Sequence, residues 1–128
     1  MREIKFRAWH KEHKKMLTVY VIHQGTYSEG FVKNCQGYVP PNDQYYFKFD
    51  QAEWMQYTGL KDKNGKEIYE GDIIMYHFKT KSTNDEFISK VFWDEYMWLT
   101  DEHSINRIND IEIIGNIYEN IELLNKTT

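Results

Sequence analysis

Residues whose side chains could bind a metal ion are scattered along this chain. His10 and His13, with Glu12 between them, form the closest pair of histidines. The two-histidine zinc motif places its histidines four residues apart on a helix. This pair is three residues apart in a wholly polar stretch, which indicates a turn. We therefore interpret both histidines as surface residues and predict no metal site.

The single cysteine, Cys35, cannot form a disulfide within the chain, and so cysteine usage gives no indication of secretion. Nearby Gly37, Pro40 and Pro41 predict a loop around it. A cysteine nucleophile needs a base or another group that stabilises its thiolate. No pattern of histidine and acid in the sequence points to Cys35, so we predict that it is not catalytic.

Adjacent carboxylates occur three times, each time in an expected turn or strand end. Acid–base catalysis needs carboxyl groups that converge in one pocket and have separated pKa values. Solvated turns are the simpler interpretation, and the sequence has no P-loop or dinucleotide motif. We therefore predict no catalytic residue, no cofactor and no enzymatic activity. The three pairs are Asp85–Glu86, Asp94–Glu95 and Asp101–Glu102.

Aromatic side chains are the outstanding feature of the composition. They make up 16% of the 128 residues, as 4 Trp, 10 Tyr and 7 Phe, while alanine occurs only at positions 8 and 52. Disordered chains are poor in rings, and helical bundles favour alanine. The composition therefore disfavours disorder and an all-helical fold. It does not decide whether the rings pack in the core or bind a partner.

Five aromatic residues are candidates for binding because small β-barrels present rings to peptides or stack them on bases. Core packing is the competing interpretation, since large buried side chains dominate small cores. Two of the five lie on either side of an expected two-residue turn, in a hairpin with large side chains on both faces. Either both faces are buried or one is an interface. The candidates are Tyr57, Tyr69, Tyr76, Trp93 and Trp98.

Short β-branched, aromatic or alternating segments predict a chain made of strands. Asn64-Gly65 indicates a hairpin turn because both residue types accept positive φ, and Gly115 indicates a bulge. Asn120 is expected to cap a final helical turn. Residues 23–44 predict a long loop or two short strands around Phe31-Val32. The expected strands cover residues 4–9, 16–22, 45–49, 73–78, 87–93, 96–100 and 111–118.

Strands at such short spacing predict an all-β fold. We expect a small SH3-like barrel in residues 54–128, ending in a short helical turn. Residues 1–53 are expected to form an N-terminal β region, with a hairpin and an irregular loop.

Three segments of the chain resemble one protein family, in that family's order. The opening Arg2–Trp9 is similar to its N-terminal motif, and Ile111–Asn120 to its closing motif. The central stretch Met55–Ile74, with its Tyr-Thr-Gly-Leu-Lys-Asp-Lys-Asn-Gly run, resembles the core signature of the YopX family of phage and prophage proteins. The resemblance implies an SH3-like β-barrel with an N-terminal β region. It carries no established activity, and therefore no catalytic residues.

Charge is unevenly distributed along the chain. The net charge is −4, yet residues 1–15 carry +4 and residues 94–122 carry −7. An acidic chain does not have the basic balance of a strong nucleic-acid binder. Opposed charged segments are typical either of binding faces or of solvated sheet edges that prevent unwanted pairing.

These observations favour a phage- or prophage-encoded protein that binds a phage or host protein, or assembles with itself, without catalysis. A nucleic-acid-binding barrel is the alternative, and an enzyme with an unrecognised site in residues 23–50 is a weaker one. No apolar run reaches the roughly 20 residues that span a bilayer, and we expect no signal peptide, because the first residues lack an apolar stretch. We expect a protein of the host cytoplasm that does not bind membranes. The lysines of the nucleic-acid alternative are Lys61, Lys63, Lys66, Lys79 and Lys81.

Overall fold

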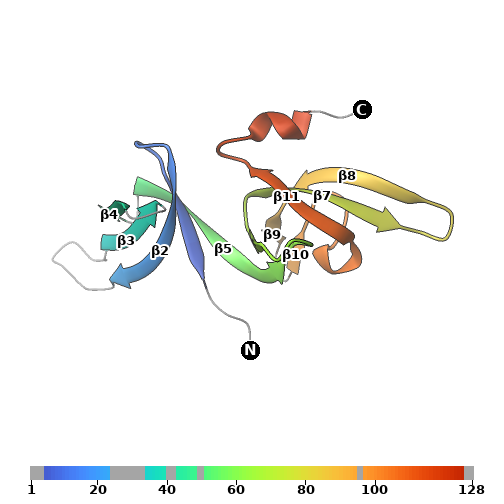
Figure 1. Ribbon diagram of the computed structural model, residues 1–128, viewed down its shortest axis with the longest axis horizontal. Coiled ribbons are helices and arrows are strands. Elements are labelled where there is room, and N and C mark those ends of the chain that lie inside the picture. The colour runs from blue at the N-terminus through green and yellow to red at the C-terminus, as the bar shows by residue number, and fades with distance from the viewer. Residues whose placement is uncertain (1–4, 24–33, 40–42, 49–50, 95–96, 126–128) are drawn as a thin grey trace. The chain divides into compact units, whose positions relative to one another are not determined.

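The computed structural model describes residues 5–23, 34–39, 43–48, 51–94 and 97–125. Over these residues the regular structure consists of β-strands and short 3-10 helices (Figure 1). The predicted all-β class is confirmed, while the SH3-like barrel stays a prediction. The described residues fall into two compact units, which divide between Gln56 and Tyr57.

The N-terminal unit is an antiparallel meander. Its strand order is β4-β3-β2-β1-β5, so each strand lies beside its neighbour in sequence except where β5 returns to pair with β1. The predicted hairpin between the first two strands is confirmed, with Ala8 opposite Leu17. The strands are β1 Phe6–His10, β2 Lys15–His23, β3 Asn34–Val39, β4 Asp43–Lys48 and β5 Ala52–Lys61.

A small apolar cluster holds the described part of this unit together. Ala8 and Leu17 are completely buried, and Ala52 is nearly so. Val19 and Trp54 pack against these three residues. Ala8 alternates with outward-facing neighbours, as the predicted period of two requires. The chain's two alanines therefore both lie in this core, where a small side chain lets neighbouring strands pack closely.

The loop predicted around Cys35 is wrong, because Cys35 lies in β3. The local composition, with Gly37 in the segment, disfavours a strand. β3 is nevertheless paired on both sides, by β2 and by β4. Those two ladders satisfy its backbone hydrogen bonds, which outweighs the weak local preference. The strands expected around Phe31-Val32 lie outside the described residues.

The C-terminal unit contains a three-stranded antiparallel sheet in the order β11-β7-β8 and a separate hairpin of β9 and β10. The second half of β5 pairs with β6. Two 3-10 helices, η2 Ile105–Arg107 and η3 Ile121–Asn125, flank β11 in sequence. The strands are β6 Glu67–Tyr69, β7 Asp72–Lys79, β8 Asn84–Lys90, β9 Phe92–Asp94, β10 Met97–Leu99 and β11 Asn109–Asn116.

The core of this unit lies on one face of the three-stranded sheet. Side chains alternate along β7, so that Ile74 and Tyr76 point together into this core. Phe78 and Phe87 pack against it from its margin. The remaining buried members come from several elements and are Ile68, Val91, Trp98, Ile105 and Ile108.

The single strand predicted over residues 87–93 is wrong, because β8 ends at Lys90 and β9 begins at Phe92. Val91 lies between them and bonds to the start of β7 through its backbone. Its N–H donates to the Asp72 carbonyl, and its carbonyl accepts from the Gly71 N–H, both at 2.9 Å. The chain therefore leaves one sheet and enters the hairpin at this residue.

The predicted turn at Asn64-Gly65 is present, but only Gly65 of the two has positive φ, at 83°. The turn is wider than a two-residue hairpin loop and closes between Asp62 and Lys66, where the Asp62 N–H donates to the Lys66 carbonyl at 2.8 Å. The predicted bulge at Gly115 is confirmed by a register shift between Ile113 and Gly115. No helix among the described residues is long and apolar enough to cross a membrane.

Candidate interaction surface

The β9–β10 hairpin brings two tryptophans together. Trp93 and Trp98 are directly opposed across the two strands, and directly opposed residues share one face of an antiparallel pair. Their ring centroids lie 4.8 Å apart, with the planes at 69°. Trp98 is only 5% exposed and belongs to the core, whereas Trp93 is 42% exposed. A buried ring thus supports an exposed one.

This arrangement gives the exposed ring a fixed base. An edge-to-face contact between two rings adds about 0.5–1.5 kcal/mol beyond burial, so Trp93 does not move freely in solvent. Tryptophan is, with tyrosine and arginine, enriched at the positions that dominate binding energy. In addition, the indole Nε1 of Trp98 is buried without a hydrogen-bond partner among the described residues.

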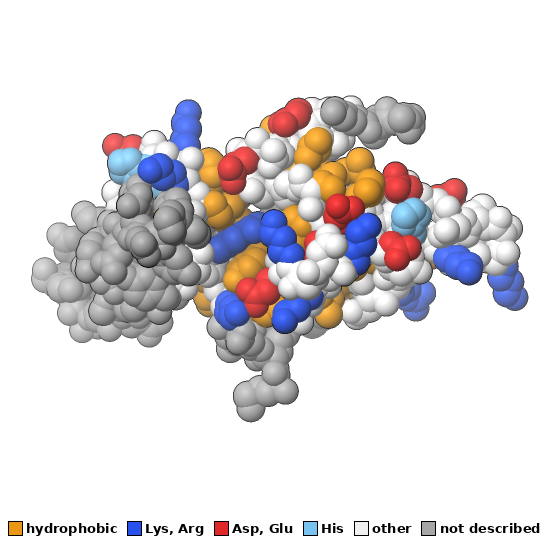
Figure 2. Space-filling model, in the orientation of Figure 1, with side chains coloured by type: hydrophobic (Ala, Val, Ile, Leu, Met, Phe, Trp, Pro, Cys, Tyr) orange, Lys and Arg blue, Asp and Glu red, His pale blue; other side chains and the backbone are white. Residues whose placement is uncertain are grey.

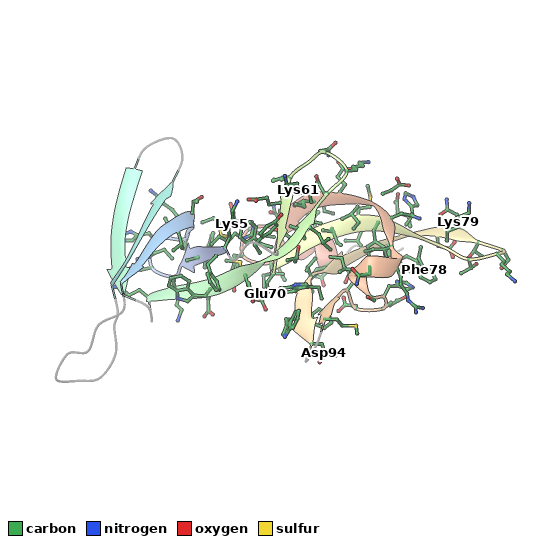
Figure 3. All side chains as sticks on the ribbon, turned by 90° about the horizontal axis from the view of Figure 1, so that it is seen from below. Lys5, Lys61, Glu70, Phe78, Lys79 and Asp94 are labelled. Carbon is green, nitrogen blue, oxygen red and sulfur yellow. The ribbon has the colours of Figure 1, made fainter. Side chains whose placement is uncertain are left out.

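The other face of the hairpin carries an exposed apolar side chain beside a charged one. Met97 lies opposite Asp94 and is 46% exposed. At the base of β9, the Lys90 ammonium lies 5.9 Å from the centroid of the Phe92 ring, within the range of a cation–π contact. Figure 3 labels Asp94 at the end of this hairpin. Trp93 and Met97 therefore present apolar surface on both sides of a two-stranded element.

The remaining candidate rings are less accessible. Tyr57 is 5% exposed and pairs across the strands with half-buried Tyr69, at 5.5 Å between ring centroids. Tyr76 is 1% exposed. Of the five candidates, Trp93 is the one with a substantially exposed ring. The binding role of the group stays a prediction, and exposure favours Trp93 as the residue that carries it.

Tyr76 is the centre of a buried polar cluster. Its hydroxyl is hydrogen-bonded to Thr100 Oγ1 at 3.1 Å and to His103 Nδ1 at 3.0 Å. The His103 ring stacks on Phe78 at 4.0 Å. Burial, with the nearby carboxylates, raises the pKa of the Tyr76 phenol above its ordinary value, although the Thr100 hydrogen bond opposes this. These contacts fix the 100–103 turn to the sheet.

The histidine pair near the N-terminus differs from the prediction. His10 is buried, at 3% exposure, and its Nδ1 accepts a hydrogen bond from the His13 N–H at 3.1 Å. Burial lowers the pKa of His10, as does the neighbouring His13, although Glu12 opposes them. The prediction that both are surface histidines is therefore wrong for His10. Its role is to close the turn between β1 and β2.

The paired carboxylates have separate partners where the structure describes them. Asp101 accepts a hydrogen bond from the Ser89 hydroxyl at 3.1 Å. Glu86 lies 3.5 Å from His77 Nε2. Among the described residues, no group of three or more His, Cys, Asp or Glu side chains could hold a metal ion.

Asp62 is a buried acid that links two parts of the C-terminal unit. Its Oδ1 accepts the N–H groups of Asn64 and Lys66 in its own turn, both at 2.9 Å. Its second oxygen accepts from the Ile113 N–H, far along the chain. Burial alone would raise the pKa of Asp62, but these hydrogen bonds and the Lys66 charge outweigh it and lower the pKa. Nothing in the sequence near Asp62 indicates this contact with Ile113.

The chain matches a known protein family over nearly all of its length. The model of the YopX protein family matches residues 5–125, and the chain therefore belongs to the YopX family. Among solved structures, protein EF1440 from Enterococcus faecalis is similar, with 26% identity and a TM-score of 0.64. The likeness covers 97% of this chain and 99% of that one. A comparison with curated proteins finds no match.

Proposed function

We propose that this chain is a non-catalytic protein-interaction module, encoded by a phage or prophage and acting in the host cytoplasm. The observation that carries the proposal is the Trp93–Trp98 pair, in which an exposed indole rests on a buried one. Rigid aromatic rings gain binding energy at low entropic cost. The phage setting is what the resemblance to phage and prophage proteins of the YopX family implies, and the match to that family over residues 5–125 supports it.

Charge supports a protein partner over a nucleic acid. Lys63, one of the lysines of the nucleic-acid alternative, lies 3.2 Å from Glu112 and is partly neutralised by it. Asp94, at the end of β9, and Asp101 are exposed and add negative charge close to the two tryptophans in sequence. Such charges repel phosphates, whereas stacking on nucleic acid normally works together with a positive groove.

The test is affinity capture from a lysogenic or infected host with the wild-type chain and two variants. Trp93→Ala removes the exposed ring, and Leu60→Ala is the control, because Leu60 has a similar exposure of 37%. We expect a protein that is captured by the wild type and by Leu60→Ala, but is at least about tenfold depleted with Trp93→Ala.

Capture that is equal for all three chains would contradict the proposal. Captured material that survives protease and is removed by nuclease would support the nucleic-acid alternative instead. A gel shift with single- and double-stranded DNA and RNA at low salt, where phosphate contacts are strongest, checks that outcome directly.

A further inference from the structure

β8 is an edge strand with one free side. In the part of the chain that the structure describes, β8 pairs with β7 alone and ends the sheet order β11-β7-β8. Figure 1 shows β7 and β8 as a long hairpin. A free edge presents a row of unpaired backbone N–H and C=O groups to any strand that can align with it. Natural edges are commonly blocked by proline, bulges or charge.

The side chains on the outer face of β8 alternate acid, apolar and base. Glu86, Ile88 and Lys90 lie opposite His77, Met75 and Ile73 of β7, and so they share the sheet face opposite to that of Tyr76 and Phe87, on which Ile73 itself is buried. All three are exposed, Ile88 at 38%. Phe87 points to the other face, where it packs against the core. When a second copy of β8 runs antiparallel to the first, this order places acid opposite base and the apolar residue opposite itself.

We propose that β8 is a docking edge for β8 of a second copy of this chain, joined antiparallel about a two-fold axis at Ile88. This inference goes beyond the proposed function, because it assigns the self-assembly that the sequence favours beside a phage or host partner. In that register Glu86 of each copy lies opposite Lys90 of the other, and Ile88 lies opposite itself. Opposite charges directly across an antiparallel pair stabilise it, and like charges destabilise it.

The charges also disfavour the two registers that lie four residues away. Sliding the second strand by four residues in one direction places Glu86 opposite Glu86, and in the other direction places Lys90 opposite Lys90. Both arrangements bring like charges together. A charged edge that served only to prevent pairing would not need both signs on one face at this spacing.

Apolar surface beside the edge adds to the proposed contact. η3 lies next to β8, and its Ile121 is 52% exposed. Figure 2 shows hydrophobic side chains gathered over β8 and toward η3. Joining two edges would extend each three-stranded sheet across the axis, give backbone hydrogen bonds to both free edges and cover Ile88. The interface is isologous, as in most homodimers.

The first test reverses the charges. We expect wild-type protein to have a mass by light scattering of twice the 15.6 kDa chain. Glu86→Lys or Lys90→Glu alone should weaken dimerisation by about tenfold or more, because two attractive pairs become repulsive. The double variant Glu86→Lys/Lys90→Glu should restore it. Lys81→Glu, in the β7–β8 turn, is the control, and thermal unfolding checks that every variant is folded.

The second test fixes the register. In a Cys35→Ser background, Ile88→Cys should be cross-linked rapidly by a short bismaleimide, since directly opposed Cβ atoms lie about 5 Å apart. Asn84→Cys, four residues from the axis, would lie about 26 Å from its copy and should not react. A wild-type chain that stays monomeric at about 0.1 mM would overturn the proposal. So would a dimer that tolerates both single reversals or fails to recover in the double variant.

Failure here is distinguishable from failure of the proposed function. A monomeric chain that still captures a protein through Trp93 would overturn only the β8 edge. A dimer with the expected charge dependence and no Trp93-dependent partner would leave self-assembly as the module's function.

Discussion

Asp62 Oδ2 accepts a hydrogen bond from the Ile113 N–H at 3.1 Å, although 51 residues separate the two in sequence. The same carboxylate accepts two further N–H groups within its own turn. The Lys63 N–H donates to the Ile111 carbonyl at 2.8 Å and adds a second link to β11. One buried carboxylate thus closes the β5–β6 turn and fastens it to the last strand.

Replacement of Asp62 should destabilise the C-terminal unit. In Asp62→Ala three partly buried backbone N–H groups lose their acceptor, and each such hydrogen bond contributes about 0.5–1.5 kcal/mol to stability. We expect the free energy of unfolding to fall by about 3 kcal/mol. Urea denaturation followed by near-ultraviolet circular dichroism measures this loss. A loss below about 0.5 kcal/mol, within the range of an ordinary surface substitution, would show that the contacts are incidental.

Asp62 should also give the protein a stability that depends on acid pH. Its folded pKa lies below the ordinary value of 3.8, so its contribution is complete above that value and is lost as pH falls toward the folded pKa. The stability difference between wild type and Asp62→Asn should therefore shrink from about pH 6 to about pH 2. A difference that stays constant over this range would refute the assignment.

Two glycines should respond differently to asparagine. Gly65 has positive φ and open space where a Cβ would lie, whereas a Cβ at Gly115 would lie 2.6 Å from Asn120 Oδ1. Asparagine tolerates the left-handed conformation, so Gly65→Asn should cost well under about 1 kcal/mol. Gly115→Asn should cost about 1–3 kcal/mol through overpacking. Thermal unfolding of both variants compares them, and equal losses would contradict this explanation.

The buried hydroxyl of Tyr76 should matter most at high pH. Tyr76→Phe removes both hydrogen bonds and should cost about 1–2 kcal/mol near neutral pH. The raised pKa of Tyr76 means that its contribution is complete below the ordinary value of 10.0 and declines as pH rises toward the folded pKa. Wild type should therefore lose more stability than Tyr76→Phe between about pH 9 and pH 11. Parallel pH profiles in urea denaturation would contradict this.

The two tryptophans should separate stability from binding. Trp98→Ala removes a large buried ring and should cost about 3–5 kcal/mol. Trp93→Ala loses mainly one ring contact and should cost about 1 kcal/mol. Chemical denaturation distinguishes the two values. Similar large losses for both would place Trp93 in the core and remove the basis of the interaction surface.

The sequence was sufficient to predict those structural elements that depend on a few neighbouring residues. The alternation around Ala8, the glycine turns and the Gly115 bulge are each determined by a few neighbouring residues, and all of these features are present. β3 was missed because its strand conformation comes from ladders on both sides, and not from its own composition. The break at Val91 was missed because it depends on Asp72 and Gly71.

For the candidate site, too, the sequence predicted what depends on neighbouring residues and not what depends on distant ones. The sequence placed Trp93 and Trp98 on one hairpin, and the structure confirms that they are opposed. Period-two alternation decides which face a side chain points to, and these two share a face. Which of the two is buried depends on residues that pack from elsewhere, among them Ile105 and Ile108. The β8 edge likewise became visible only once the order of the strands was known.

The central claim is that Trp93 contacts a protein, and site-specific photo-cross-linking in a lysogenic or infected host tests it most directly. A photoreactive phenylalanine analogue replaces Trp93 in one chain and Leu60 in the control. We predict a discrete, protease-sensitive adduct from position 93 that is at least about tenfold weaker from position 60. Equal adducts from both positions, or none from position 93, would contradict the claim.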